Sequence, residues 1–206
     1  MKKRLILTSS GINSPRIIKK FDKLVNKKRS EIKILVLYGQ KHPKYLAYVK
    51  KELKKLGFDE KNIIYTDINY TKLKKSLEEI DVLYFMGGET FVILKKLRAT
   101  GSDKLIKKFV NSGKIYVGAS ASSIIAGPNI KIASWGSDGE ENLAGLKEKE
   151  WNGLNLTKVS IYPHYKDKLS KEIVDFKKEI KNKYLAIALK DGEAVIINGN
   201  KKEVLK

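Results

Sequence analysis

The sequence contains no cysteine, and only two histidines, two tryptophans and four prolines among its 206 residues. Without cysteine the chain has no disulfides, no thiolate metal ligands and no cysteine nucleophile. No apolar run approaches the roughly 18 residues of a membrane-spanning helix. The basic start, residues 1–10, briefly resembles a signal peptide, but its apolar part is too short, so we interpret it as a first strand. These absences favour a cytoplasmic protein.

Acidic residues are also scarce, because 23 Asp and Glu face 43 Lys and Arg, which gives a formal net charge of +20. Such an excess raises nucleic-acid binding as a hypothesis. Lysines supply most of the charge, and they lie in helix-like segments such as YVKKELKKLGF, opposite the apolar positions. This arrangement is typical of solvated helix faces. We therefore expect neither nucleic acid nor a membrane as a partner, and a monomer or a homodimer.

Short hydrophobic runs alternate with amphipathic segments over the first 120 residues. Hydrophobic residues make up 42% of the chain, which is enough for a substantial core. The alternation predicts an α/β three-layer sandwich with a mostly parallel central sheet, in one domain that spans residues 1–206. The expected strands are 5–8, 34–38, 63–66, 82–86 and 115–117, and the expected helices are 15–26, 43–56, 70–77, 90–97 and 103–110.

The pattern changes after Gly127 and predicts a β-rich C-terminal part. Residues 135–155, which are rich in Gly, Glu and Asn, are expected to form a long surface excursion. Turns are expected at Asp191-Gly192 and at Asn198-Gly199-Asn200, since Asn-Gly favours hairpins. The other expected elements are strands in 130–134 and 158–165, a helix at about 170–180, and two or three strands within 184–206.

The segment GASAS, residues 118–122, lies between an expected strand and an expected helix. The carboxyl ends of parallel strands carry the ligand site, and a nucleophile on a sharp strand-to-helix turn needs small neighbours. Ser120 is therefore the candidate nucleophile. Ala121, at the helix N-terminus, would donate one N–H to an oxyanion. The alternative is a tight turn in which Ser120 merely caps the helix.

A serine nucleophile needs a base and a carboxylate that orients it. We interpret His42 as a surface loop residue, whereas His164 ends an apolar strand and is the candidate base. Asp191 also closes an apolar strand and is the first choice for the acid, although an Asp-Gly turn corner would explain it too. Its rivals lie in one acidic loop, Asp138, Glu140 and Glu141.

A second glycine turn, Gly87-Gly88 followed by Glu89, ends another expected strand. Two glycines allow a backbone to approach a ligand closely, so an N–H of this turn is a candidate second oxyanion donor. The turn has neither the GxxxxGK[ST] nor the GxGxxG spacing of a phosphate-binding loop.

The stretches YFMGGETFVILKKLRATG, GKIYVGASASSIIAGPNI and YPHY resemble the peptidase E family of aspartyl dipeptidases. That family belongs to the class I glutamine amidotransferase-like superfamily, with its flavodoxin-like sheet. The resemblance implies hydrolysis of small acidic peptides with an N-terminal aspartate, without a metal or other cofactor. It implies Ser120 as the nucleophile, His164 as the base, and Gly88 and Ala121 as the oxyanion donors.

The acidic member of the triad has two placements in this family. One follows the penultimate strand in a Gly-Leu-Pro-Glu-Gly context, which ALKDG resembles, with Asp191 at that position. The other is an Asp shortly after the nucleophile's helix. Trp135 is aligned there, and Asp138 is close to it. The resemblance therefore favours Asp191 and keeps Asp138 as the alternative.

Two residues depart from the family pattern. Ser122 stands in place of the last glycine of Gly-x-Ser-Ala-Gly, and Glu89 stands in place of an asparagine. A carboxylate at residue 89 would repel an acidic substrate unless it turns away or meets the substrate's α-amino group. Lys171 and Lys168 lie near the expected place of the family's aspartate-binding arginine, so Glu89 and Lys171 are weak candidates for substrate binding. The second hypothesis is an altered or inactive member that binds a small ligand or a partner.

Overall fold

The computed structural model describes residues 2–39, 42–181 and 183–206. Its main sheet has seven strands in the order β3-β2-β4-β5-β1-β8-β9. β1 to β5 are parallel, and β8 and β9 join antiparallel at the β1 edge. The mostly parallel sheet and the β-rich end are thus confirmed. The strands are β1 (Arg4–Thr8), β2 (Ile34–Tyr38), β3 (Ile63–Asp67), β4 (Val82–Phe85), β5 (Ile115–Ala119), β8 (Ala194–Asn198) and β9 (Lys201–Leu205).

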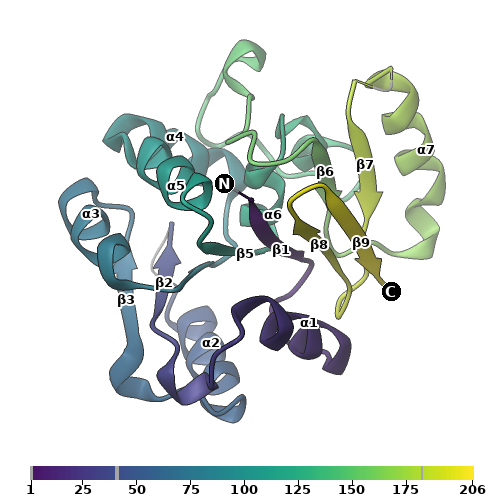
Figure 1. Ribbon diagram of the computed structural model, residues 1–206. Helices are drawn as coiled ribbons and strands as arrows, with labels where there is room; N and C mark the ends of the chain where they lie inside the picture. Colours follow the sequence, from purple (N-terminus) through teal and green to yellow (C-terminus); the bar gives the residue numbers. More distant parts are fainter. Residues whose placement is uncertain (1, 40–41, 182) are drawn as a thin grey trace.

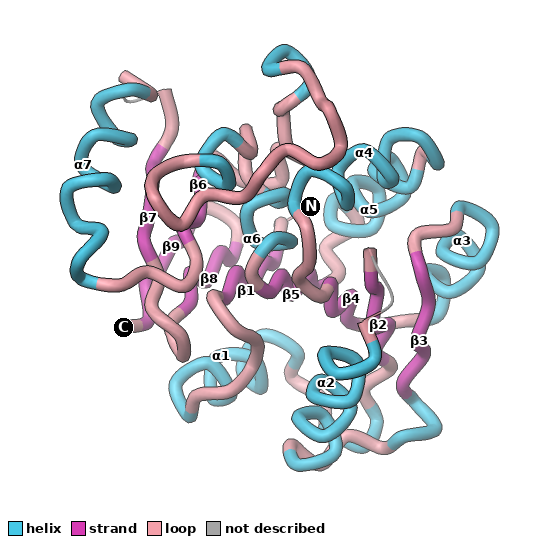
Figure 2. The backbone as a smooth tube through the Cα atoms, turned by 180° about the vertical axis from the view of Figure 1, so that it is seen from behind, coloured by secondary structure: helices cyan, strands magenta, loops and turns pink. Residues whose placement is uncertain are grey.

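Helices cover both faces of this sheet (Figures 1 and 2). On β1, Leu5 and Leu7 face one apolar cluster and Ile6 faces the other, because successive side chains of a strand point to opposite faces. The two clusters make a three-layer sandwich. One face carries α1 (Pro15–Val25) and α2 (Pro43–Lys55), and the other carries α3 (Tyr70–Glu79), α4 (Thr90–Thr100), α5 (Ser102–Asn111) and α6 (Ala121–Ala126).

A small second sheet extends the α4–α6 side of the sandwich. It pairs β6 (Val159–Tyr162) with β7 (Leu185–Ala188) in parallel. The connecting α7 (Ser170–Glu179) packs on it through Ile173 and Phe176. Because β6 and β7 are parallel, the loops that follow them leave from the same edge.

The expected strand at 130–134 is wrong, because Lys131–Ser134 form a 3-10 helix. Its first turn is fixed locally, since Asn129 Oδ1 accepts from Lys131 N (2.7 Å) and Ala133 N donates to Ile130 O (2.8 Å). Short apolar alternation does not distinguish a strand from such a turn.

The expected surface excursion at 135–155 is only partly correct. The acidic residues Asp138, Glu141 and Glu148 are exposed, but Leu146 and Leu154 are buried in the core cluster. Trp151 Nε1 donates to Leu146 O (3.0 Å), which closes the segment on itself. Sparse apolar residues in a polar segment can thus still anchor it to the core.

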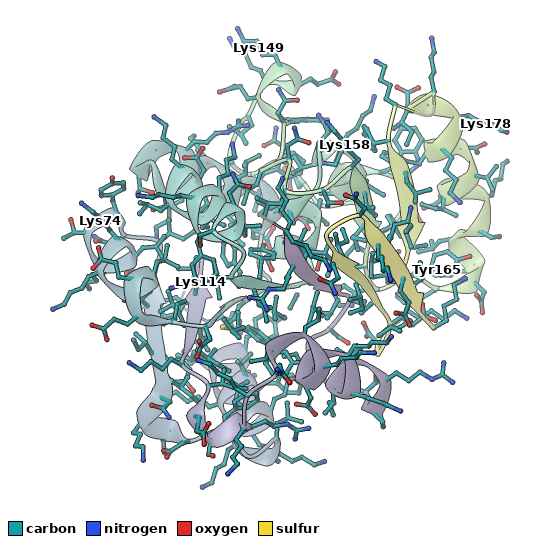
Figure 3. All side chains as sticks on the ribbon, viewed as in Figure 1. Lys74, Lys114, Lys149, Lys158, Tyr165 and Lys178 are labelled. Atoms are coloured by element: carbon teal, nitrogen blue, oxygen red, sulfur yellow. The ribbon has the colours of Figure 1, made fainter. Side chains whose placement is uncertain are left out.

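The basic residues lie mostly on the outside. Lys74, Lys149, Lys158 and Lys178 are exposed, and Figure 3 shows Lys149 and Lys178 at the outline of the molecule. None of the helices in the described ranges has the length and apolar character that a membrane crossing requires.

Candidate active site

Ser120 sits on a strained turn between β5 and α6. Its φ of 54° and ψ of −119° are conformations that L-residues rarely adopt, as expected for a nucleophile on a strand-to-helix turn. Ser120 N donates to Thr8 O (3.1 Å), and Ser120 O accepts from Ser123 N (2.8 Å). Ser120 occupies the N-cap position, but its hydroxyl makes no capping hydrogen bond. The hydroxyl is therefore directed elsewhere.

Two glycines make room for this turn. A Cβ on Gly118 would lie 2.9 Å from Tyr116 Cε1 and 3.0 Å from Ser123 N. A Cβ on Gly87 would lie 3.0 Å from Ser120 Cβ. Both glycines are therefore needed for β4, β5 and α6 to meet this closely.

Ser122, which departs from the family pattern, is fully buried beneath the turn. Its Oγ accepts from Ala119 N (2.8 Å) and donates to Phe85 O, while Tyr116 Oη donates to Ser122 O (2.7 Å). The extra side chain thus links the ends of β4 and β5 to α6, and the turn accommodates it.

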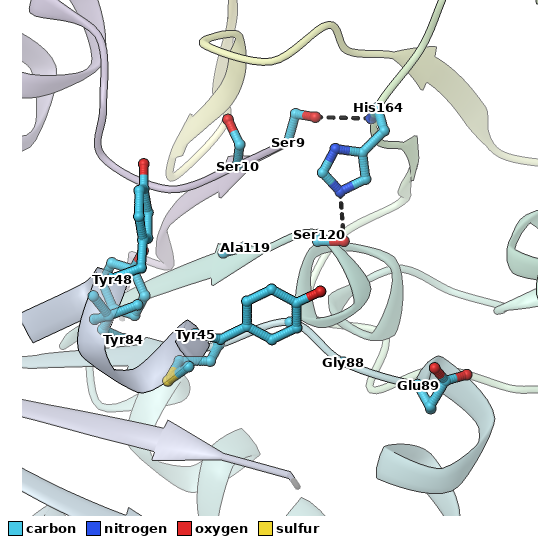
Figure 4. Close-up of a pocket in the computed structure, with 13 residues that line it drawn as sticks. Ser9, Ser10, Tyr45, Tyr48, Tyr84, Gly88, Glu89, Ala119, Ser120 and His164 are labelled. Atoms are coloured by element: carbon cyan, nitrogen blue, oxygen red, sulfur yellow. Dashed lines mark hydrogen bonds between the residues drawn. The ribbon is translucent and has the colours of Figure 1, made fainter. Parts of the chain in front are cut away.

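His164 lies in the loop after β6, two residues beyond the strand's end. Its Nε2 is 2.9 Å from Ser120 Oγ, and its Nδ1 is 2.8 Å from Asp191 Oδ1. An ionised carboxylate only accepts, so this network assigns the proton to Nδ1. The lone pair of Nε2 then faces the Ser120 hydroxyl (Figure 4).

Asp191 lies in the turn between β7 and β8. Tyr165 N donates to Leu189 O (3.0 Å), which holds the loop after β6 against the loop after β7. The Asp191 side chain is 64% exposed and that of His164 is 49% exposed. Partial burial acts to raise the pKa of Asp191, but hydrogen bonds from Ser9 and His164 and the electrostatic attraction of the imidazole outweigh it, so the pKa is lowered.

Ser9, at the carboxyl end of β1, was not singled out from the sequence. It is fully buried, its Oγ accepts from His164 N (2.8 Å), and the same Oγ donates to Asp191 Oδ1 (2.8 Å). Figure 4 shows the Ser9–His164 contact. The sequence held a signal for it, because Ser9 and Ser10 directly follow an apolar strand, as Ser120 does.

The two expected oxyanion donors, Gly88 and Ala121, have free backbone N–H groups among the described residues. Gly88 lines the cavity beside Ser120, with a φ of 143°. Ala121 is the first residue of α6, where backbone N–H groups have no partner within the helix. Among the described residues, no backbone acceptor takes the N–H of either residue.

The other candidates from the sequence lie outside this network. Asp138 pairs with Lys166 (3.5 Å) and makes no hydrogen bond to His164 within the described residues. Glu140 caps α4, since its carboxylate accepts from Thr90 N (2.8 Å) and Thr90 Oγ1 (2.6 Å). Lys171 is exposed on α7 and is not among the residues that line the cavity. His42 is exposed, as expected, and stacks on Tyr45.

A cavity of about 470 Å³ opens beside Ser120 and His164. In the view of Figure 4, Tyr48 and Tyr84 lie to the left of Ser120, Tyr45 lies below it, and Glu89 lies to the right. None of the residues found to line the cavity is a lysine or an arginine. Its volume suits a ligand of the size of a short peptide.

Tyr84, one of the tyrosines that line the cavity, contacts the buried carboxyl group of Glu52. Tyr84 Oη donates to Glu52 Oε2 (3.0 Å), while Glu52 Oε1 is buried without a hydrogen-bond partner among the described residues. Burial raises the pKa of Glu52 to about 7, although the Tyr84 hydroxyl acts in the opposite direction. Across residues 2–39, 42–181 and 183–206, no group of three or more His, Asp or Glu side chains could hold a metal ion.

Comparisons with known proteins point to one family. The model of peptidase family S51 matches residues 5–205. An uncharacterized peptidase of Listeria monocytogenes is 32% identical, over 78% of this chain and 77% of the relative. Peptidase E of Shewanella denitrificans is 29% identical, over 60% of this chain and 48% of the relative.

A crystal structure shares the whole fold. It is that of a Listeria monocytogenes protein provisionally assigned to peptidase E, and it superposes with a TM-score of 0.75 at 26% identity. The match covers 100% of this chain and 99% of that one. The resemblance seen in the sequence thus extends over the full α/β fold.

Proposed function

Since the chain belongs to peptidase family S51, we propose that it is a serine peptidase whose triad is Ser120, His164 and Asp191. One observation carries the proposal. A strained Ser120, an imidazole and a carboxylate are joined by contacts of 2.9 and 2.8 Å, in the order that nucleophilic catalysis needs.

The mechanism follows from these contacts. His164 Nε2 removes the Ser120 proton as Oγ attacks the peptide carbonyl, and the N–H groups of Gly88 and Ala121 hold the oxyanion. His164 then protonates the leaving amine. A water molecule, activated in the same way, releases the acyl group and restores Ser120. Asp191 keeps the proton on Nδ1 and stabilises the imidazolium.

The substrate preference is a separate proposal from the type of reaction. The resemblance implies short peptides with an N-terminal aspartate, and we propose these as the first substrates to test. Glu89, at the cavity rim, is then suited to the α-ammonium group of the peptide rather than to the aspartyl carboxylate. The described cavity wall offers no basic side chain for that carboxylate.

The lack of a described basic side chain in the cavity wall also supports a second candidate function. A cavity with Glu89 and no described Lys or Arg also suits an altered member of the family that binds an uncharged or cationic ligand without hydrolysing it. The two functions differ in whether the Ser120 hydroxyl is chemically activated.

The test combines a probe and a substrate panel. A fluorophosphonate, which phosphonylates activated serines, should label the wild type at Ser120, as mapped by mass spectrometry. Ser120→Ala should lose all labelling, while Ser112→Ala, which changes an exposed serine at the end of α5, should keep it. Hydrolysis of Asp-Leu, Glu-Leu, Leu-Leu and a chromogenic aspartyl amide then measures the preference. A folded wild type that neither reacts nor cleaves would overturn the peptidase proposal in favour of ligand binding.

A further inference from the structure

One buried hydroxyl group contacts both the base and the carboxylate that orients it. His164 N donates to Ser9 Oγ (2.8 Å), and Ser9 Oγ donates to Asp191 Oδ1 (2.8 Å). The same Asp191 oxygen lies 2.8 Å from His164 Nδ1. The three contacts form a closed ring of hydrogen bonds. We infer that Ser9 is a positioning residue of the triad, an inference that rests on the proposed peptidase function.

The ring matters because Asp191 is exposed. Its side chain, 64% exposed, lies in a turn, where water competes for the carboxylate and the side chain has several rotamers. Within the described residues its carboxylate interacts with the His164 imidazole and with the hydroxyl groups of Ser9 and Ser10, and Ser9 alone of these is fully buried. The Ser9 hydroxyl therefore fixes the rotamer of a carboxylate that would otherwise turn into solvent.

The same hydroxyl group also fixes the backbone of His164, through a second hydrogen bond. This residue has a left-handed φ of 54°, which a non-glycine side chain disfavours. In that conformation its N–H points at Ser9 Oγ, so the hydrogen bond stabilises the loop that carries the imidazole. Losing the bond would let the imidazole move relative to Ser120.

The end of β1 also locates the nucleophile. Thr8 O accepts from Ser120 N (3.1 Å) and from Ser123 Oγ (2.8 Å). Thr8 is the last residue of β1, a strand that pairs on both sides, with β5 and with β8, and Ser9 follows it directly. They therefore set the distance between Ser120 and His164, two residues that are 44 positions apart in the sequence.

Ser14 supplies a matched control. Its Oγ donates to Gly192 O (2.8 Å), so Ser14→Ala loosens the Asp191–Gly192 turn without touching the carboxylate or His164. The experiment measures fluorophosphonate labelling of Ser120 as a function of probe concentration. It thereby separates the rate of bond formation from the affinity for the probe, in the wild type, Ser9→Ala and Ser14→Ala.

We expect Ser9→Ala to slow bond formation roughly 10- to 100-fold, since misplacement by about 1 Å costs on that order, with probe affinity within about twofold. Ser14→Ala should react like the wild type. In an Asp191→Ala background, Ser9→Ala should cause a smaller loss than it does in the wild type, because one of the two contacts it removes is already gone. Ser9→Cys, which keeps the shape of the side chain but replaces the hydroxyl with a weak donor, should behave like Ser9→Ala and replaces it in the test if that variant does not fold.

Two results would overturn the inference. One is a folded Ser9→Ala, or Ser9→Cys in its place, that reacts at the wild-type rate. The other is the same loss with and without Asp191, because general damage to the fold does not depend on that carboxylate. An unreactive wild type would remove the proposed function and this inference with it, whereas an unaffected Ser9 variant of a reactive wild type removes the inference alone.

Discussion

The two halves of the site are held in opposite ways. The nucleophile half, residues 118–126 with the end of β4, is almost wholly buried, and close packing at its glycines and buried hydrogen bonds shape it. The base half, His164 and Asp191, is 49% and 64% exposed. It depends on a few hydrogen bonds between distant segments, such as Ser9 to Asp191 across 182 positions. Changes in the buried half should therefore cost stability, and changes in the exposed half should cost activity.

The largest effect should come from the exposed carboxylate. We expect Asp191→Ala to lower kcat roughly 10³- to 10⁴-fold, because the imidazole loses both its tautomer preference and its orientation. The free energy of unfolding should change by less than about 0.5 kcal/mol, since the side chain is exposed. Peptide hydrolysis and urea unfolding check the two expectations. A stable fold with full activity would show that Asp191 is no more than a turn residue.

Glu52 has a buried carboxyl group, so its effect should be on stability rather than on activity. Glu52 has a pKa of about 7 in the fold, against an ordinary value of 4.5 when unfolded, so the unfolded chain ionises first as pH rises. Stability should therefore fall between about pH 4.5 and pH 7, by on the order of 3 kcal/mol, and stay level above. Glu52→Gln should remove this part of the slope. Urea unfolding at several pH values measures it, and identical slopes in the two proteins would contradict the expectation.

Ser122 tests the buried half directly. In Ser122→Ala, the buried Ala119 N–H and Phe85 carbonyl lose their partner, so the free energy of unfolding should fall by about 1–3 kcal/mol. The folded variant should keep most of its hydrolytic activity, because the hydroxyl points away from His164. Ser112→Ala, an exposed serine, is the matched control. A fully stable Ser122→Ala would show that Gly118 and Gly87 alone shape the turn.

The smallest effect is expected at Asp138, the alternative acidic member. Its described ion pair with Lys166 is on the surface, so Asp138→Ala should change activity less than about twofold and stability less than about 0.5 kcal/mol. The same assays as for Asp191→Ala give the comparison. If Asp138→Ala instead lost the activity that Asp191→Ala kept, the assignment of the two carboxylates would have to be exchanged.

Much of the fold could be predicted from local sequence patterns. The bounds of β2 were predicted without error, and those of α1 and α2 to within one residue, because period and flanking prolines act over a few residues. The strand expected at 130–134 failed, since its apolar alternation was too short to outweigh the Asn129 turn. Ser120 and His164 could be singled out because each ends an apolar strand.

The sequence by itself determined the alternation of strands and helices, the small-residue turn at Ser120 and the family resemblance, because these depend on neighbours along the chain. Only the tertiary structure decided which carboxylate meets His164 and which hydroxyl holds that carboxylate. Asp191 and Asp138 were both open, and Ser9 went unnoticed, until the folded chain brought the residues that follow β1, β6 and β7 together. A hydrogen bond across 155 or 182 positions leaves no local pattern, so only the folded chain shows it.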